Sequence, residues 1–265
     1  MTTNPSTSAN HLTDAQAAEV LKLLTGVDSV ELKLTIPATA HRTTIQGLPL
    51  DPVEAEPRQV FFFDTPGLDL NKTGVVVRAR RIQGGRADTV VKLRPVVPEN
   101  LAARLRRSPA FGVELDALPG GFVCSGSLKG ESTGDKVRAA VGGTVPLRKI
   151  FSKEQRAFYD RNAPAGLELD SLLALGPTFT LKSRFVVKKL GRKVVAEFWL
   201  YPDGSRILEL STKCLPREAF QVAAEFRAYL ATRGIEVSGM QETKTKAALE
   251  FFRAETAGEA ARRGE

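Results

Sequence analysis

The segment GVVVRARRIQGGRADTVVKLRP, residues 74–95, contains two strand-like runs joined by a glycine-rich turn. Hydrophobic and basic side chains alternate in both runs. Arg78 and Arg80 therefore share one face of the first strand, and Lys92 and Arg94 share one face of the second. The turn is too short for the crossover that parallel strands need, so the pair is predicted to be antiparallel. The resulting sheet has one hydrophobic face and one basic face.

The same alternation recurs along the chain. It predicts eight strands, at residues 29–36, 58–64, 74–82, 88–96, 110–117, 178–189, 192–201 and 205–213. One face of these strands carries nine basic residues, namely Lys33, Arg78, Arg80, Lys92, Arg94, Lys182, Arg184, Lys188 and Lys213. The same face carries five acidic residues, namely Glu31, Glu114, Asp116, Glu197 and Glu209. The opposite face is hydrophobic and must be covered.

Two arrangements accommodate such strands. In a half-buried sheet the hydrophobic face meets the core and the charged face meets water, which explains any single strand. The recurrence of paired charges, together with enough helices to cover the hydrophobic face, favours a sheet closed into a barrel with the charges inside. We therefore expect an α+β fold, an eight-stranded antiparallel β-barrel (tunnel) with helices packed on the outside.

The chain is predicted to form one domain. We expect a flexible leader at 1–10, a single domain at 11–256 with a mostly helical insertion at about 118–176, and a flexible tail at 257–265. Within the insertion, Ser152 and Gln155 have the spacing of a capping box. Helices are also predicted at 15–26, 134–141, 217–234 and 243–255.

Composition narrows the class of partner. The net charge of +8 favours polyanions such as nucleic acid, acidic membrane surfaces or phosphorylated small molecules. Cys124 and Cys214 stand far apart and the chain has two histidines, which argues against a zinc site or a disulfide framework. The leader lacks the pattern of a signal peptide and no stretch has the length of a membrane span. We expect a cytoplasmic protein without membrane association.

Charges enclosed in a barrel must be balanced, because unpaired buried charges are costly. Nine cations against five carboxylates leave an excess of four positive charges, which is the scale of charge on a triphosphate. Carboxylates among the cations suit Mg²⁺ or Mn²⁺, which prefer oxygen ligands and share phosphate oxygens with protein carboxylates. We therefore expect Lys33 to bind phosphate and Glu31 to bind metal.

Several of these segments occur in the order and approximate spacing seen in one family. They are VELKLTIP (30–37), FFFDTPGLDLNKTGVVVRARR (61–81), DTVVKLRP (88–95), FGVELDA (111–117), ILELSTK (207–213) and ETKTKAALEFF (242–252). The chain resembles CYTH domains, also called triphosphate tunnel metalloenzymes, over most of residues 28–252 apart from the insertion. Segment 61–81 is the most specific part of the resemblance.

The resemblance implies an eight-stranded antiparallel tunnel that holds a triphosphate through Lys and Arg, with Mg²⁺ or Mn²⁺ on Glu residues. Known members include inorganic, thiamine and RNA triphosphatases and class IV adenylyl cyclases. The family's late lysine corresponds to Lys244 or Lys246. The implied phosphate-binding residues are Lys33, Arg78, Arg80, Lys92, Arg94, Lys182, Arg184, Lys213 and Lys246. The implied metal ligands are Glu31, Glu114, Asp116, Glu197 and Glu209, of which Glu31 and Glu209 are also the expected catalytic residues.

Two positions depart from the family pattern. The signature Glu-x-Glu-x-Lys falls on residues 29–33, so that Ser29 replaces the first glutamate. On the last strand, Ser211 stands where a second carboxylate is expected. The remaining carboxylates support one metal ion, whereas support for a second, water-activating ion is thinner.

The leading hypothesis is metal-dependent hydrolysis of inorganic triphosphate or an organic triphosphate. A non-catalytic polyphosphate-binding or nucleotide-binding protein is the alternative, and the two serines favour it. Class IV adenylate cyclase activity is a minor alternative, because nothing in the sequence identifies an adenine pocket. RNA 5′-triphosphate ends are a further candidate substrate, although the basic strands lack interleaved aromatic residues for base stacking.

Overall fold

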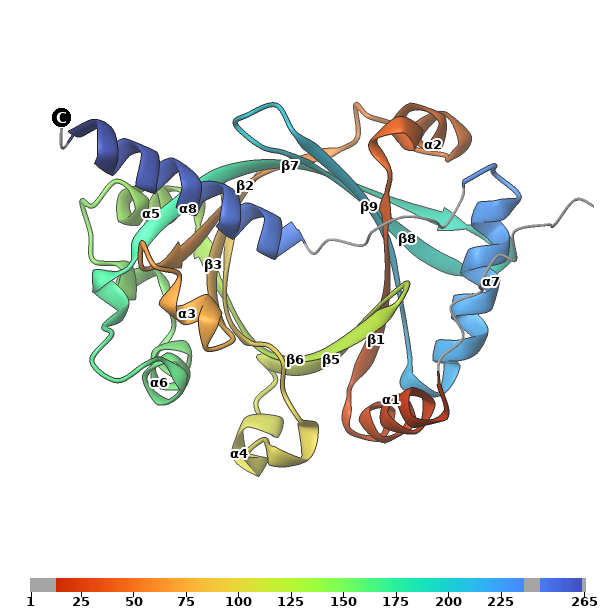
Figure 1. Ribbon diagram of the computed structural model, residues 1–265, viewed down its shortest axis with the longest axis horizontal. Helices are drawn as coiled ribbons and strands as arrows, with labels where there is room; N and C mark the ends of the chain where they lie inside the picture. The colour runs from red at the N-terminus through yellow and green to blue at the C-terminus, as the bar shows by residue number, and fades with distance from the viewer. Residues whose placement is uncertain (1–12, 236–243, 264–265) are drawn as a thin grey trace, which may run out of the picture.

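The centre of the molecule is a closed β-barrel (Figure 1). It is seen in a computed structural model that describes residues 13–235 and 244–263. Around the barrel the strand order is β1-β5-β6-β4-β3-β2-β7-β8-β9. The strands are β1 Ser29–Ile36, β2 Glu56–Asp64, β3 Val75–Ile82, β4 Arg86–Leu93, β5 Phe111–Leu118, β6 Gly121–Thr133, β7 Leu173–Val187, β8 Arg192–Leu200 and β9 Arg206–Cys214.

The prediction of a closed barrel with outer helices is confirmed, but the prediction of eight antiparallel strands is wrong. The barrel has nine strands, and β1 pairs with β5 in parallel. The extra strand, β6, lies within segment 118–176, where helical structure begins only at Gly134. Its sequence is rich in Gly and Ser, which are poor strand formers, and its stability comes from pairing with β4 and β5 on its two sides. The parallel pair is feasible because β2, β3 and β4 provide the long connection between β1 and β5.

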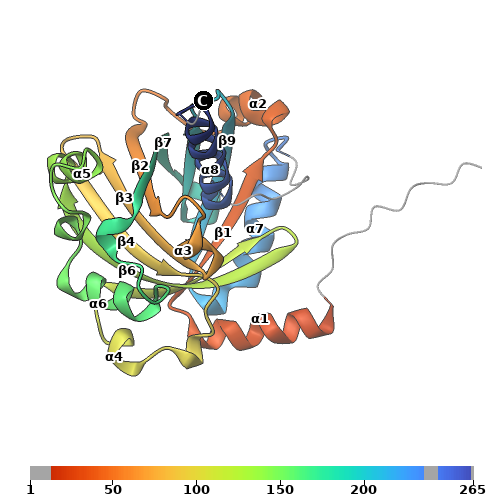
Figure 2. The same ribbon diagram turned by 60° about the vertical axis from the view of Figure 1, so that its left-hand side comes forward.

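Helices pack around the barrel (Figures 1 and 2). They are α1 Asp14–Gly26, α2 His41–Gly47, α3 Asp69–Lys72, α4 Ala103–Arg106, α5 Gly134–Val141, α6 Lys153–Asn162, α7 Ala219–Ala231 and α8 Lys244–Arg263. The capping box of Ser152 and Gln155 is present at the start of α6. None of the helices in the described ranges is both long enough and apolar enough to cross a bilayer.

The structure describes one of the two predicted terminal segments in part and does not describe the other. The leader at 1–10 lies outside the described residues. At the other end α8 extends to Arg263, so the helix covers most of the segment at 257–265 that is predicted to be a tail.

The predicted alternation divides the barrel into an outer and an inner surface. Outward side chains such as Val77 and Leu210 are buried beneath the helices and form the main core with residues such as Phe158. Inside one end of the barrel, Phe62 and Trp199 belong to a second hydrophobic cluster that includes Leu249, Phe252 and other residues of α8. Figure 1 shows α8 crossing this end of the barrel. The C-terminal helix therefore fills part of the interior, and the remaining interior is polar.

Leu128 tests whether β6 belongs to the barrel. Its side chain is fully buried in the main core, so Leu128→Ala should lower the free energy of unfolding by about 2–5 kcal/mol, measured by denaturant titration. Leu21→Ala removes the same atoms from an exposed position on α1 and should change the free energy of unfolding by less than about 0.5 kcal/mol. Equal, small effects of both substitutions would contradict the placement of β6.

Candidate functional site

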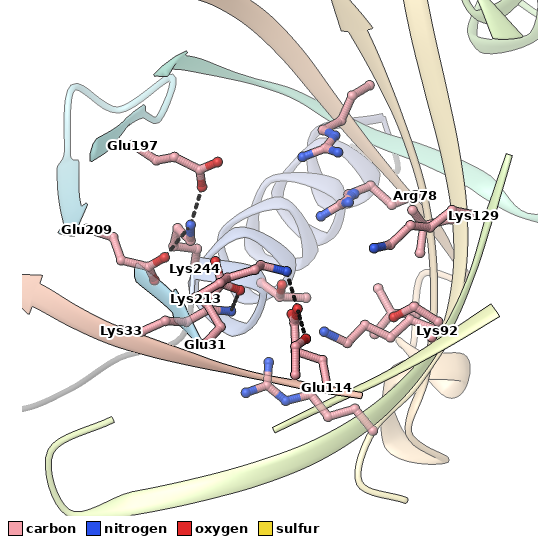
Figure 3. A pocket seen from close by; sticks show the side chains of 18 of the residues that line it. Glu31, Lys33, Arg78, Lys92, Glu114, Lys129, Glu197, Glu209, Lys213 and Lys244 are labelled. Atoms are coloured by element: carbon pink, nitrogen blue, oxygen red, sulfur yellow. Dashed lines mark hydrogen bonds and ion pairs between the residues drawn. The ribbon is translucent and has the colours of Figure 1, made fainter. Parts of the chain in front are cut away.

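The barrel encloses a cavity of about 330 Å³ with a mostly charged wall (Figure 3). Among the described residues, every strand except β2 contributes to its lining. Helix α8 adds Lys244 and Thr245 from its first turn. The cavity is thus built from segments that span nearly the whole chain, and it exists only when the barrel is closed.

Most of the predicted site residues line this cavity. They are Glu31, Lys33, Arg78, Arg80, Lys92, Arg94, Glu114, Lys182, Glu197, Glu209 and Lys213. Asp116 is fully buried behind the wall, where its carboxylate contacts three of the lining cations. Arg184 does not line the cavity and instead lies 3.9 Å from the carboxylate of Glu56. The side chain of Lys246 lies outside the described residues.

One side of the cavity carries glutamates paired with lysines, and the opposite side is basic. Figure 3 shows Glu197, Glu209 and Glu31 on one side, with Arg78, Lys92 and Lys129 facing them from the other. The acidic side comes from β1, β8 and β9, and the basic side comes from β3, β4 and β6. A polyanion with bound cations would therefore meet complementary charge on both sides.

Lys33 forms ion pairs with two carboxylates, one on β1 and one on β5. Its Nζ lies 2.7 Å from Asp116 and 3.2 Å from Glu31. Burial by itself lowers the pKa of Lys33, but Asp116 and Glu31 raise it above its ordinary value. Burial likewise favours protonation of Asp116, yet Lys33, Lys92 and Arg94 bring the pKa of Asp116 down to about 2. Both groups are therefore charged at neutral pH.

Lys244 reaches from α8 into the acidic side. Its Nζ lies 2.6 Å from Glu209 and also forms an ion pair with Glu197, and it stands 5.2 Å from the centre of the Trp199 ring. Glu197 accepts a further hydrogen bond from Lys182 at 2.9 Å. Although burial opposes ionisation, Lys244 and Lys182 hold the pKa of Glu197 well below its ordinary value. The contact joins the last helix to the charged interior.

The cations on the basic side of the cavity form fewer ion pairs than those on the acidic side. Among the described residues Arg78 forms no ion pair, and its Nε has no hydrogen-bond partner. Burial, reinforced by Arg80, lowers the pKa of Arg78 to about 9. Burial also lowers the pKa of Lys92 to about 8, in spite of the attraction of Asp116 at 3.7 Å. A bound anion would relieve the cost of holding these cations in the barrel.

Ser29 and Ser211, which stand where the resemblance predicts carboxylates, both form hydrogen bonds to glutamates of the cavity. Ser29 donates a hydrogen bond to Glu114 at 3.4 Å, and Ser211 donates one to Glu31 at 3.1 Å. Each hydroxyl stabilises a carboxylate but adds no charge. The cavity is accordingly poorer in metal ligands than the family pattern implies.

A divalent cation fits the chemistry of one carboxylate cluster. Glu31, Glu114 and Asp116 each place an oxygen within 4.8 Å of the others, and oxygen donors suit Mg²⁺ or Mn²⁺. Lys33 and Lys213 already form ion pairs with these carboxylates. A metal ion would therefore compete with lysine side chains for the same oxygens.

Sequence reasoning missed one basic residue of the cavity wall. Lys129 lines the basic side but belongs to β6, the strand that was not predicted. The signal for it was present, because polar residues alternate at positions 125, 127, 129 and 131. Lys244, one of the two residues predicted as the family's late lysine, lines the cavity.

Lys244→Met should destabilise the protein in a pH-dependent way. At pH 7 removal of the ammonium group leaves Glu197 and Glu209 with fewer partners, and the free energy of unfolding should fall by about 3 kcal/mol. The folded-state pKa of Glu197 is depressed, so its contribution is present above about pH 4.5 and is lost as the pH falls further. The difference between wild type and variant should narrow at pH 3 in denaturant titrations.

Lys72→Met is the matched control, because Lys72 forms an exposed ion pair with Asp69. Lys72→Met should change the free energy of unfolding by no more than about 0.5 kcal/mol at pH 7 and at pH 3. A gap between wild type and Lys244→Met that is the same at pH 7 and pH 3 would contradict the proposed ion pairs.

Solved structures with this fold include the following two. HpAC1 from Hippeastrum, a candidate adenylyl cyclase described as having a dominant triphosphatase activity, is 16% identical with a TM-score of 0.58, over 86% of this chain and 96% of that chain. A candidate adenylate cyclase from Bacillus halodurans is 14% identical with a TM-score of 0.56, over 83% of this chain and 96% of that chain. No protein-family model and no curated protein sequence matches the chain. The chain therefore has the fold of these adenylate-cyclase-like proteins, and its resemblance to the CYTH, or triphosphate tunnel, class is confirmed at the level of the fold.

Proposed function

We propose that the protein binds a triphosphate in the barrel cavity and hydrolyses it with the help of Mg²⁺ or Mn²⁺, the substrate being inorganic triphosphate or an organic triphosphate. The observation that carries this proposal is the basic side of the cavity, where among the described residues Arg78 has no ion-pair partner and Lys92 has only Asp116, at 3.7 Å. The triphosphatase activity described for the Hippeastrum protein of the same fold supports it.

The basic residues provide the contacts that phosphoryl oxygens need. Arg78 and Arg80 present guanidinium groups from β3, which suit two-point contact with phosphate. Lys92, Lys129 and Lys182 add ammonium groups from three other strands. Because these groups surround the cavity, a linear chain of phosphates can contact several of them at once.

The carboxylates are proposed to hold the metal ion. Glu31, Glu114 and Asp116 form the cluster described above, and Glu197 and Glu209 are the remaining proposed ligands. A bound Mg²⁺ or Mn²⁺ neutralises charge on phosphate oxygens and stabilises the charge that develops during transfer. Lys33 keeps the pKa of Glu31 below its ordinary value against the effect of burial, so Glu31 is ionised at neutral pH. Glu31 and Glu209 are the proposed catalytic carboxylates, and an ionised Glu31 would be able to accept a proton from an attacking water.

Binding without turnover is the second candidate function. Ser29 and Ser211 replace two family carboxylates, and lysines form ion pairs with the four glutamates that line the cavity. In that case the metal requirement would be weak and the protein would retain a polyphosphate or nucleotide without releasing phosphate. ATP belongs in the same assays, because both neighbours of this fold are described as candidate cyclases.

Arg78→Met tests the phosphate site. It should weaken binding of inorganic triphosphate by about 10- to 100-fold, because a charged hydrogen-bond donor is lost, as measured by calorimetry. Arg138→Met, which removes an exposed arginine on α5, should leave the dissociation constant unchanged. Release of phosphate by the wild type with added metal would show hydrolysis. Tight binding without release of phosphate would instead support the second candidate function, binding without turnover. Failure of the wild type to bind triphosphate would refute both.

Ser29→Glu tests whether a missing carboxylate limits turnover. The new side chain would lie beside Glu31 and Glu114 and complete the family signature, and should raise phosphate release at low metal concentration by about tenfold. Ser29→Gln supplies nearly the same shape without the charge and is the control. If both variants behave alike, metal affinity at this position does not limit the rate.

A further inference from the structure

A second basic cluster lies next to the cavity and is not part of its lining. We call Arg58, Arg86 and Arg184, which surround the single carboxylate of Glu56, the arginine rim. Arg58 donates to Glu56 through Nε at 2.6 Å, and Arg86 lies 3.0 Å from the same carboxylate. Arg184 is 3.9 Å away, beyond hydrogen-bonding distance. The three arginines come from β2, β4 and β7, which lie together on one side of the barrel.

The arginine rim continues the cavity along the inner surface of the barrel. On β7, Lys182 lines the cavity, and Arg184 is the next residue on the same face. On β4, Asp88 pairs with the cavity residue Arg80 at 2.8 Å, and Arg86 is the next residue on that face. Leu175, which packs in the cluster with α8, lies on the other side of Lys182 along β7. The rim is therefore at the end of the barrel opposite α8.

Electrostatics connects the two regions. Burial is the main reason that the pKa of Arg78 and that of Lys182 are lowered, and the charge of Arg58 adds to both shifts. Arg58 thus acts on residues that line the cavity, although it does not line the cavity itself.

The arginine rim carries an unbalanced charge. Within residues 13–235 and 244–263, Glu56 is the sole carboxylate within 4 Å of any of the three guanidinium groups, which leaves a net charge of about +2. The side chain of Arg58 is only 7% exposed, whereas those of Arg184 and Arg86 are 41% and 69% exposed. The buried guanidinium of Arg58 and the two accessible guanidinium groups of Arg86 and Arg184 share one carboxylate. Together they form a preorganised site for a further anion.

We propose that the arginine rim binds the phosphoryl groups of a linear polyphosphate that extend beyond those held in the cavity. This inference rests on the proposed function, because it assigns the cavity to the first phosphates of the chain. Guanidinium groups suit phosphate oxygens in a two-point geometry, and Arg184 lies 3.9 Å from Glu56, too far for a hydrogen bond that would hold its donors. Among the described residues no aromatic ring forms a cation–π contact with any of the three arginines, which favours inorganic polyphosphate over RNA.

The test compares ligands of different length on the same variants. Arg86→Met, Arg184→Met and the double variant remove the accessible arginines but keep buried Arg58, and thermal melting verifies that they fold. Binding of inorganic triphosphate and of polyphosphate of about 15 phosphates is measured by calorimetry, with Arg138→Met as the charge-matched control. The double variant should lose about tenfold or more in affinity for the long chain and less than about twofold for triphosphate.

Each outcome has a distinct meaning. An equal loss for both ligands, or no loss for the long chain, would overturn the assignment of the rim. If wild type fails to bind triphosphate but the rim variants still lose affinity for the long chain, the proposed function fails while the rim remains a phosphate site. A larger loss for an RNA bearing a 5′-triphosphate than for polyphosphate would assign the rim to a nucleic-acid backbone and overturn the choice of polyphosphate.

Discussion

The need to neutralise charge inside a closed barrel governs the rest of this structure. A sheet whose two faces are hydrophobic and ionic can hide only one of them in an ordinary core. Closure into a barrel, with helices outside, buries the hydrophobic face such as Val77 and Leu210 and turns the ionic face inward. The interior then needs counter-charges, and lysines such as Lys33 and Lys244 supply them to the carboxylates. Arg78 of β3 has no ion-pair partner among the described residues, and there the interior is suited to an anion.

The cations inside the barrel fall into two groups, those that neutralise carboxylates and those that have no ion-pair partner among the described residues. Lys33, Lys213 and Lys244 mainly hold carboxylates, and the ion pairs keep those carboxylates charged. Arg78 and Lys129 have no ion-pair partner among the described residues and are free to meet a ligand. The net positive charge of the chain alone could not reveal this distinction, because it depends on which strands become neighbours across the barrel.

Much of the fold and of the site could be predicted from the sequence, because the parity of charged residues along a strand survives folding. Arg78, Arg80, Lys92 and Glu209 line one cavity for that reason. The strand β6 was not predicted because its glycines and serines obscure the alternation of polar and hydrophobic residues. The parallel pairing of β1 with β5 was not predicted because it depends on closure of the barrel, which brings together segments far apart in the sequence. Arg184 has the right parity but lies one step further along β7, since the pattern gives the face of a strand but not the depth along the barrel axis.

The position of β1 has a consequence for how the chain reaches its native state. Ser29–Ile36 lies between β5 on one side and β9 on the other, and β9 ends at Cys214. Its two partners are therefore far away in sequence, and the last of them leaves the ribosome only when most of the chain has been made. Folds that depend on such distant pairings form slowly, and their unpaired edges stay exposed in the meantime. The strand that bears Glu31 and Lys33 would consequently be among the last to gain both of its neighbours.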